Sequence, residues 1–433
     1  MRKINLSDKA ILMHEQYFEN NILVEIKNEY QNSSYHPSLS EIRALKKKVE
    51  PKWEETKIRK KLVRQHILFL RYVENRYKIF ATGKKTDLKE LNEFIKENFH
   101  LVYHLIRIDV KNQKGNNYSN HLNKIFCYEK FKVKDFFYYI KKLAIRNLKL
   151  DQNSRYSHKI QDEIVNILVT NYPNHTKEIF SKLGKGELYA SECEKNFREL
   201  TKLNITMDNF KQLDIFQKEW NDYHFILESS IRVCPYCNRQ YITPILSDNG
   251  KMRADIDHFL PKNEYPYFSM SIYNLVPVCK PCNQSLKGDR NFTFDNISPY
   301  DDNISDYFKF EANLSTYEVS TVVSKGQDAI YRHLDIFKIE ALYNYHQNHV
   351  EELVKKRIAY PDKYIQDLYE KNKDYFNNEL EVKQIIVGYI HDINRLNDEA
   401  FLKFRLDLAQ QLGFLETCGQ DRIDRLKELI KVT

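Results

Sequence analysis

Four cysteines in two close pairs are the residues with the clearest chemistry in this sequence. Each pair, Cys234 with Cys237 and Cys279 with Cys282, is a Cys-x-x-Cys step that contains a proline. One such step brings two sulfur atoms to the same ion, and two steps complete a tetrahedral Zn²⁺ site. Four thiolates leave no open coordination position, so we expect this zinc to hold structure and not to catalyse. A disulfide pair or a redox motif is the alternative.

The segment between the two cysteine pairs carries residues suited to chemistry at a phosphate. In a strand, Asp255 and Asp257 would lie on one face and His258 on the other. Asn283 directly follows the second pair, so the zinc site would fix its direction. Carboxylate and amide oxygens suit Mg²⁺, with water and phosphate oxygens completing the octahedron. An Asp-His pair alone is more often structural, and Asp255 either tunes such a metal site or makes only a structural hydrogen bond.

The order Asp257-His258, Asn274 and Asn283 resembles the HNH nucleases with a ββα-metal fold, in the variant whose third position is Asn and whose finger is braced by zinc. The resemblance covers roughly sixty to seventy residues of the chain. It implies that His258 is the general base. It also implies that Asp257 and Asn283 bind a catalytic Mg²⁺ or Mn²⁺ ion, and that Asn274 orders the loop and orients the base.

Hydrolysis of a phosphodiester is the reaction that these residues can support. A neutral His258 would take a proton from water while the metal ion stabilises charge on the phosphorane and on the leaving 3′ oxygen. Lys287 lies four residues after Asn283 and would contact a phosphate from the same helix face. Lys262 and Arg239 are weaker candidates for phosphate binding.

The wider form of the segment, CPYCNRQY followed by DIDHFLPK and YPYFSMSIYNLVPVCKPCN, looks like the HNH subunits of bacterial antiphage systems of the Septu type. That resemblance implies an effector nuclease of a defence or restriction complex, double-stranded DNA as the substrate, and a separate ABC-like or AAA ATPase as partner. The helical N-terminal region is larger than in those subunits. The sequence has no Gly-rich phosphate loop, so any ATP dependence would come from another chain.

Two other readings of the same residues stay open. The site acts on a phosphodiester, which DNA and RNA both supply, so an RNA-cleaving nuclease, for example one acting on tRNA, is the first alternative. The second is a zinc-braced nucleic-acid-binding or scaffold protein that does not cut.

The elements that must position these residues are mainly helices. Ten glycines in 433 residues are far fewer than the average of about 7%, so few tight turns are available. Amphipathic patterns predict basic helices over 57–73 and 134–150. Period-two alternation predicts a hairpin of strands 307–311 and 317–322 after the cysteine segment.

The sequence therefore predicts a mainly α fold, with helical N- and C-terminal lobes around a small zinc-braced ββα-metal nuclease domain. The expected regions are a helical region over 1–230, which can contain two subdomains, a nuclease domain over 231–300, and a hairpin with further helices over 301–433.

Positive charge is concentrated in one stretch of the N-terminal region. The formal net charge is +8, and fifteen Lys or Arg stand against five Glu between Glu41 and Lys85. Such a stretch suits a solvated helix face, a partner-binding surface or a surface that follows phosphates.

Several function classes are disfavoured by what the sequence lacks. No apolar run approaches the roughly eighteen residues that could cross a bilayer. The basic N-terminus is not followed by the apolar segment of a signal peptide, so we expect a cytoplasmic protein with no membrane partner. The isolated Cys127, Cys193 and Cys418 are expected to be inert thiols, and His346 and His349 to be helix-surface residues.

Overall fold

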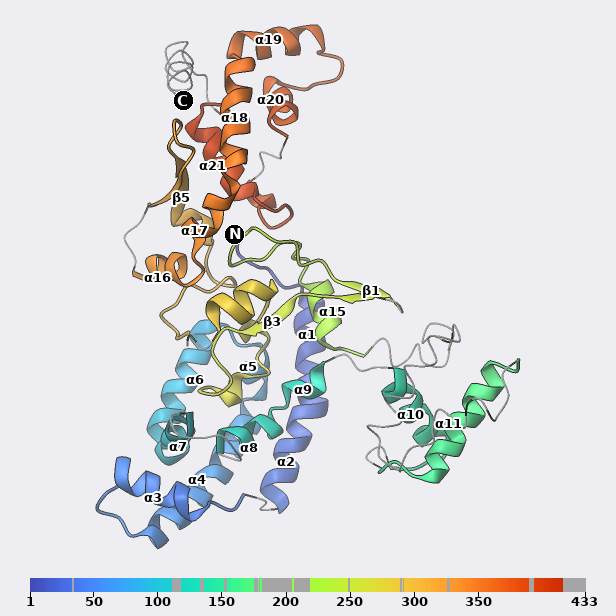
Figure 1. Cartoon of the computed structure of the whole chain (residues 1–433). Coiled ribbons are helices and arrows are strands. Elements are labelled where there is room, and N and C mark those ends of the chain that lie inside the picture. The colour runs from blue at the N-terminus through green and yellow to red at the C-terminus, as the bar shows by residue number, and fades with distance from the viewer. Residues whose placement is uncertain are drawn as a thin grey trace. The chain divides into compact units, whose positions relative to one another are not determined.

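The structure is a computed structural model that describes residues 1–32, 35–110, 118–132, 136–151, 154–174, 178, 180, 205, 219–247, 250–288, 290, 292–324, 328–388 and 393–415. The described chain is mainly helical, which confirms the predicted fold class, and its strands form three two-stranded antiparallel sheets (Figure 1). A larger compact unit comprises Met1–Tyr128, Ile226–Thr243 and Arg253–Thr433. A smaller unit comprises Glu129–Phe225 and Pro244–Met252. The units therefore cut across the three consecutive regions expected from the sequence.

Helices make up the N-terminal part of the larger unit. Helix α4 confirms the predicted basic helix, because Ile58, Leu62, Phe69 and Val73 are buried along one stripe. The helices, which run from blue to teal in Figure 1, are α1 (Asp8–Tyr17), the π-helix η1 (Phe18–Ile22), α2 (Leu23–Asn32), α3 (Leu39–Lys48), α4 (Glu55–Asn75), α5 (Tyr77–Thr82), α6 (Lys85–Asn98), α7 (His100–Val110) and α8 (Tyr118–Ile125). Helix α9 (Tyr128–Phe131) begins at the last residue of this stretch and continues into the smaller unit.

The smaller unit contains the second predicted helix. Helix α10 (Phe136–Asn147) packs against α11 (His158–Asn171) through a core that includes Ile140, Leu143 and Ile164. The strands β1 (Ile245–Ser247) and β2 (Gly250–Met252) also belong to this unit and pair antiparallel. This short hairpin was not predicted.

The cysteine segment folds as two strands followed by a helix. Strand β3 (Asp255–His258) pairs antiparallel with β4 (Leu275–Val278), so that Asp255 lies opposite Val278 and His258 opposite Leu275. The connecting loop contains two 3₁₀ turns, η5 (Pro266–Phe268) and η6 (Ile272–Asn274), and the π-helix η7 (Pro281–Lys287) follows β4. Helix α15 (Asp222–Glu228) precedes the segment.

The N-terminal helices hold the loop between β3 and β4. Burial lowers the pKa of His14 to about 4, so its neutral ring donates from Nε2 to the Met270 carbonyl oxygen at 2.8 Å. Three further hydrogen bonds fix the loop: Ser271 Oγ to Phe80 O (2.5 Å), Ser269 Oγ to Phe126 O (2.8 Å) and Tyr267 Oη to Asn92 Oδ1 (2.9 Å). The loop is therefore part of the folded core.

The C-terminal part of the larger unit confirms the predicted hairpin and helices. Strand β5 (Phe308–Ala312) buries alternate residues and pairs antiparallel with β6 (Val319–Val323). Asp407 and Gln411 accept from the β5 backbone at Phe310 N and Ala312 N. The remaining elements are η8 (Ile304–Asp306), α16 (Asp328–Ile336), α17 (Ile339–Tyr343), η9 (Asn344–His346), α18 (Gln347–Ala359), α19 (Asp362–Lys371), α20 (Glu379–Val387), η10 (Ile393–Arg395) and α21 (Leu402–Gln411).

The sequence also made predictions about the isolated cysteines, two histidines and membrane spans. Cys193 and Cys418 lie outside the described residues, and Cys127 is half-buried. His346 and His349 are partly covered by Phe401, with ring centroids 4.6 and 5.4 Å from it, so they are less exposed than expected. No helix in the described ranges is both long enough and apolar enough to cross a membrane.

Candidate active site and candidate zinc centre

The four paired cysteines come together in the interior of the larger unit. Their sulfur atoms all lie within 4.8 Å of one another, and the Sγ atoms of Cys237 and Cys279 are 3.9 Å apart. Tetrahedral Zn–S bonds of about 2.3 Å place sulfur atoms about 3.8 Å apart. All four side chains are buried and none forms a disulfide. The cluster can therefore hold a zinc ion, as the spacing predicts.

Each cysteine pair forms a tight turn that directs both sulfurs inward. The backbone N–H of Asn238 donates to Cys234 O at 2.9 Å, and that of Asn283 donates to Cys279 O at 3.1 Å. Asn238 has a φ of 52°, in the left-handed region that asparagine tolerates better than most residues. The second turn thereby fixes the backbone position from which the Asn283 side chain projects.

The C-terminal helices enclose the first cysteine turn. Tyr343 Oη donates to Cys237 O at 2.8 Å, and His333 Nε2 donates to Tyr236 O at 3.0 Å. Asn238 accepts from Lys403 N at its side-chain oxygen, at 3.1 Å. The cluster is thus integrated with the C-terminal helices, whereas the sequence suggested a small separate domain.

Asn283 contacts Asp255 and not Asp257. Its Nδ2 donates to Asp255 Oδ2 at 3.1 Å, and Gln284 Nε2 donates to the same oxygen at 2.9 Å. Asp255 is partly exposed at the start of β3. A carboxylate and an amide that can turn its oxygen inward are donors that fit Mg²⁺ or Mn²⁺. The structure therefore offers Asp255 and Asn283 as the adjacent pair of hard ligands.

Asp257 is engaged in a buried ion pair with Lys287. The Lys287 ammonium donates to both carboxylate oxygens, at 2.7 and 2.6 Å, and Tyr236 Oη donates to Oδ2 at 2.8 Å. Lys287 also donates to the His258 carbonyl oxygen at 2.8 Å. Burial lowers the pKa of Lys287, while the Asp257 charge opposes that shift. This arrangement does not fit the predicted phosphate contact of Lys287, because its ammonium lies in the interior.

His258 stands at the end of β3 with its ring held on two sides. Nε2 donates to the Ser269 carbonyl oxygen at 3.0 Å, and the Tyr128 ring lies edge-on with a centroid distance of 4.8 Å. Donation from Nε2 makes Nδ1 the proton-accepting nitrogen of the neutral ring. The side chain is half-buried. It therefore combines a fixed orientation with access to solvent.

Asn274 ties the two ends of the β3–β4 loop together. Its Oδ1 accepts from Leu260 N at 2.6 Å, and its Nδ2 donates to Leu260 O at 3.1 Å and Phe268 O at 2.9 Å. Its own carbonyl oxygen accepts from Phe259 N at 2.9 Å. Because all these contacts are to backbone within two residues of His258 or Ser269, Asn274 sets the loop geometry that orients the histidine.

The two weaker phosphate-binding candidates lie in different surroundings. Lys262 is exposed in the β3–β4 loop. Arg239 is half-buried near His346, whose pKa is lowered by burial and then by the Arg239 charge. Arg239 thus faces the C-terminal helices, and phosphate binding by either residue stays a prediction.

Two residues of the site were missed by sequence reasoning. Tyr236 is one of the two residues between Cys234 and Cys237, and only the fold reveals that it donates a hydrogen bond to Asp257. Tyr128, against His258, comes from a helix far upstream in the chain. Neither position carries a local sequence signal for such a contact.

Replacing Lys287 by methionine should destabilise the protein by about 3–5 kcal/mol, because the Asp257 carboxylate would stay buried without its cation. Chemical denaturation measures the change. Lys280→Met is the matched control: this lysine is exposed in the same segment, and its loss should alter the unfolding free energy by less than about 0.5 kcal/mol. Adding Asp257→Asn to Lys287→Met should recover part of the loss. Equal stability of Lys287→Met and wild type would contradict the role of this pair.

Comparison with known proteins gives one short similarity. No family model matches the chain, and no solved structure matches it. The chain is similar to Protein ea31 of Escherichia phage lambda, with 42% identity over 66 residues, which is 15% of this chain and 19% of the phage protein. The chain thus covers about a fifth of that protein's length, and the name of the phage protein states no activity.

Proposed function

We propose that this chain is a metal-dependent endonuclease of the HNH type that hydrolyses phosphodiester bonds in DNA. The observation that carries the proposal is the support given to His258. Strand β3 ends at this residue, Asn274 closes the loop after it, and Ser269 and Tyr128 orient its ring. The ring is thus held in one orientation while the side chain stays half-buried, which is the combination that a general base needs.

The chemistry assigned to this site is general base catalysis. His258 donates from Nε2 to the Ser269 carbonyl, so Nδ1 is the atom that would accept the proton of an attacking water. A bound Mg²⁺ or Mn²⁺ ion would stabilise the negative charge that develops on the phosphate oxygens. Asp255 and Asn283 are the residues that would hold this ion, because they are already adjacent. The expected products carry a 5′ phosphate and a 3′ hydroxyl.

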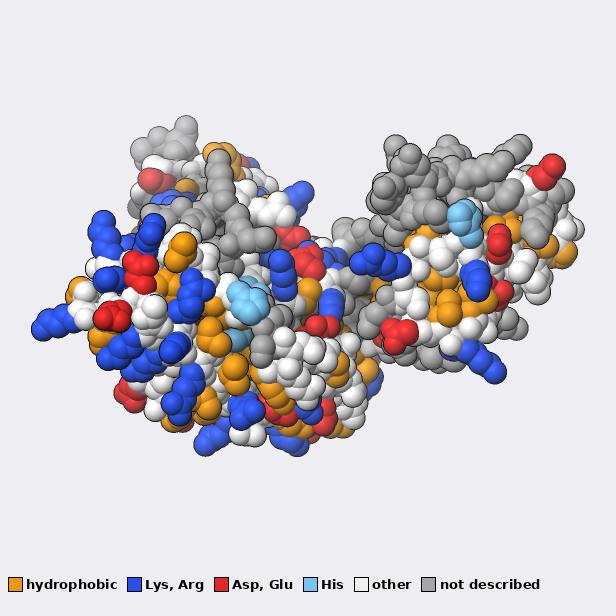
Figure 2. Space-filling view, turned by 90° about the horizontal axis from the view of Figure 1, so that it is seen from below, with side chains coloured by type: hydrophobic (Ala, Val, Ile, Leu, Met, Phe, Trp, Pro, Cys, Tyr) orange, Lys and Arg blue, Asp and Glu red, His pale blue; other side chains and the backbone are white. Residues whose placement is uncertain are grey.

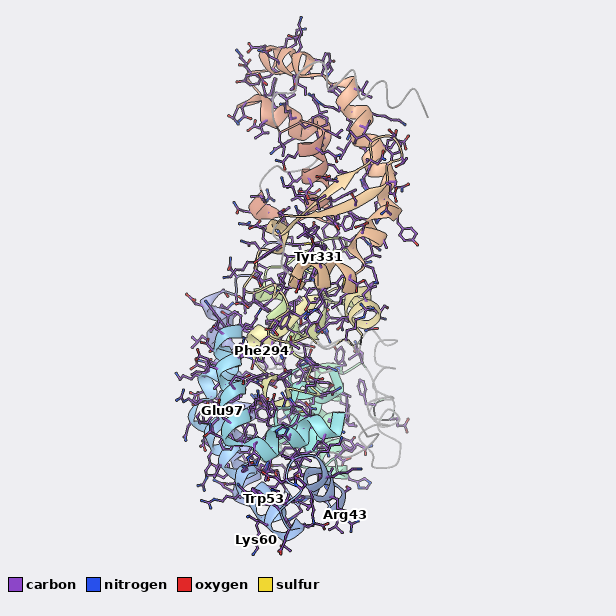
Figure 3. All side chains as sticks on the ribbon, turned by 90° about the vertical axis from the view of Figure 1, so that its left-hand side faces the viewer. Arg43, Trp53, Lys60, Glu97, Phe294 and Tyr331 are labelled. Atoms are coloured by element: carbon purple, nitrogen blue, oxygen red, sulfur yellow. The ribbon has the colours of Figure 1, made fainter. Side chains whose placement is uncertain are left out.

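A basic hollow on the N-terminal helices supports a polyanionic substrate. It has a volume of about 660 Å³, and Lys57, Lys60, Lys61 and Arg64 of α4 line it. The ammonium groups of Lys57 and Lys61 lie 4.7 and 4.2 Å from the Trp53 ring centroid. Trp53 and Lys60 are labelled in Figure 3, and Figure 2 shows Lys and Arg side chains among hydrophobic ones on the underside. Cations beside a half-buried ring suit phosphates and bases.

The substrate class is tested by incubating the purified chain with supercoiled plasmid, linear duplex, single-stranded DNA and structured RNA, in Mg²⁺, Mn²⁺ or chelator. Metal-dependent cutting of DNA supports the proposal. Cutting of RNA alone would replace the proposed DNA endonuclease activity by a ribonuclease activity.

If no substrate is cut, the assay is repeated with any ATPase that co-purifies. Continued inactivity would favour a non-catalytic binding protein. The ATPase partner and a defence role rest on the resemblance alone.

Asp255→Asn and Asp257→Asn should have different effects. We expect Asp255→Asn to weaken Mn²⁺ binding by at least the ~10–100-fold that loss of an outer-shell partner causes, without lowering the melting temperature. Asp257→Asn removes the carboxylate beside buried Lys287 and should lower the melting temperature. Isothermal titration with Mn²⁺ and thermal denaturation separate the two. If Asp257→Asn alone loses Mn²⁺ affinity, Asp257 is the ligand, as the family resemblance implies.

A further inference from the structure

A second group of metal-binding side chains lies among the N-terminal helices, apart from the cysteine cluster. Glu29 of α2, His66 of α4 and His121 of α8 each offer one ligand atom, and these three atoms lie within 4.8 Å of one another. Glu29 Oε1 is 2.8 Å from His121 Nε2 and 3.5 Å from His66 Nε2. Three separate helices thus direct two imidazoles and one carboxylate at the same point.

One ring nitrogen of His66 has a hydrogen-bond partner and the other faces Glu29. His66 Nδ1 lies 2.8 Å from the hydroxyl of Tyr118, and His66 is 2% exposed. Nε2 is buried and makes no hydrogen bond, although the Glu29 carboxylate is close. At 3.5 Å the contact with Glu29 Oε1 is too long for a good hydrogen bond. Nε2 therefore lies where it and the carboxylate could share a cation.

Aromatic rings fix the planes of both imidazoles. The Tyr35 ring centroid lies 4.8 Å from that of His66 and 5.2 Å from that of His121. The Tyr118 ring packs at 5.7 Å from His66. Metal-bound histidines commonly have their second nitrogen held by an outer partner, which aims the first. Tyr118 supplies that partner for His66, so the cluster is organised as a metal site would be.

We propose that Glu29, His66 and His121 bind a divalent transition metal ion, with Zn²⁺ as the favoured ion. Two imidazole nitrogens and one carboxylate oxygen suit Zn²⁺ and disfavour Mg²⁺ or Ca²⁺, which take oxygen ligands. Tetrahedral bonds of about 2.0–2.1 Å separate ligand atoms by about 3.3 Å, between the two distances observed. The His121 side chain is 26% exposed, so a water molecule can complete the coordination.

This ion would join α2, α4 and α8 and so act on the loop that carries the candidate active site. Ser119 of α8 donates from Oγ to the Asn263 carbonyl oxygen in the β3–β4 loop at 2.8 Å. The site itself is independent of the proposed nuclease activity, because none of its three ligands contacts His258 or the cysteines.

Metal content of the full-length protein tests the proposal. After dialysis against Zn²⁺ and then buffer, we expect two zinc ions per chain by plasma mass spectrometry, and one in His66→Gln and in His121→Gln. His100→Gln is the matched control, because His100 also contacts a glutamate, Glu50 at 3.1 Å, but belongs to no group of three metal-binding side chains in the described part of the chain. It should keep both ions. Equal zinc content in wild type and His121→Gln, or loss of zinc from His100→Gln as well, would overturn the site.

Cobalt titration of the wild-type chain gives an answer that no folding defect can obscure. Cobalt bound by thiolates shows intense sulfur-to-metal charge-transfer absorption, whereas cobalt bound by nitrogen and oxygen shows only weak visible bands. We expect one thiolate-bound equivalent and one equivalent bound by nitrogen and oxygen, and the same result in Asp255→Asn, in which the proposed Mg²⁺ site cannot contribute. Binding of cobalt by thiolates alone would overturn the proposal even if every histidine variant failed to fold.

Discussion

Cys279→Ser should unfold the larger unit and not merely reduce its activity. The zinc that the four cysteines can hold is bound only by the folded chain, so its binding free energy is folding free energy, on the order of 10 kcal/mol or more. Typical domains are stable by only about 5–15 kcal/mol. The first cysteine turn also contacts the C-terminal helices through Tyr343 and His333. Loss of the ion should therefore spread through the unit and not stay within a small finger.

Zinc content, circular dichroism and limited proteolysis would measure this effect. Cys127→Ser is the matched control, because Cys127 is half-buried and lies outside the cluster. It should keep the zinc content and the protease resistance of the wild type. Chelator treatment of the wild type should reproduce the Cys279→Ser result. A folded, protease-resistant Cys279→Ser protein without metal would exclude a structural zinc at this cluster.

His258→Ala should lower the rate of DNA cleavage by about 10²–10⁴-fold, the contribution usual for a positioned general base. The fold should survive, because Asn274 and the serines of the loop still hold it after the single hydrogen bond from the imidazole to Ser269 is lost. Zinc content and DNA affinity should therefore equal those of the wild type. Added free imidazole should restore part of the activity if the lost group is a base.

Cleavage rates measured under single turnover, at saturating protein, would test the assignment. His36→Ala is a suitable control, since His36 is exposed on the N-terminal part of the same unit. It should cut at the wild-type rate. Undiminished cleavage by His258→Ala would remove this histidine from the reaction, and a lowered melting temperature would point to a structural role in its place.

Local patterns predicted those features whose cause is local. The Cys-x-x-Cys spacing, the period-two hairpin and the amphipathic pattern of α4 each depend on residues a few positions apart, and the structure confirms all three. The alternation of β3 also placed Asp255 and Asp257 on one face. It could not say which of the two meets Asn283, because that depends on how η7 packs against the strand.

Contacts between distant segments account for what the sequence did not predict. Lys287 is spaced correctly for a phosphate contact, yet the neighbouring carboxylate of Asp257 draws it into the interior. Glu29, His66 and His121 belong to no short motif, since each comes from a different helix. Burial of a charge and convergence of helices are properties of tertiary packing, which single-sequence patterns do not encode.

The contacts of Asn397 have a consequence for how this protein is made. Its carbonyl oxygen accepts from the backbone N–H groups of Arg232 and Val233, next to the first cysteine turn, and its side chain exchanges two hydrogen bonds with the backbone of Arg2. At a synthesis rate of about 5–20 residues per second, residue 397 follows residue 233 by roughly ten to thirty seconds. High contact order of this kind slows folding. The nascent chain therefore lacks these contacts beside the first cysteine turn until residue 397 has been synthesised, and a ribosome that stalls before that point holds a chain in which this turn is incompletely packed.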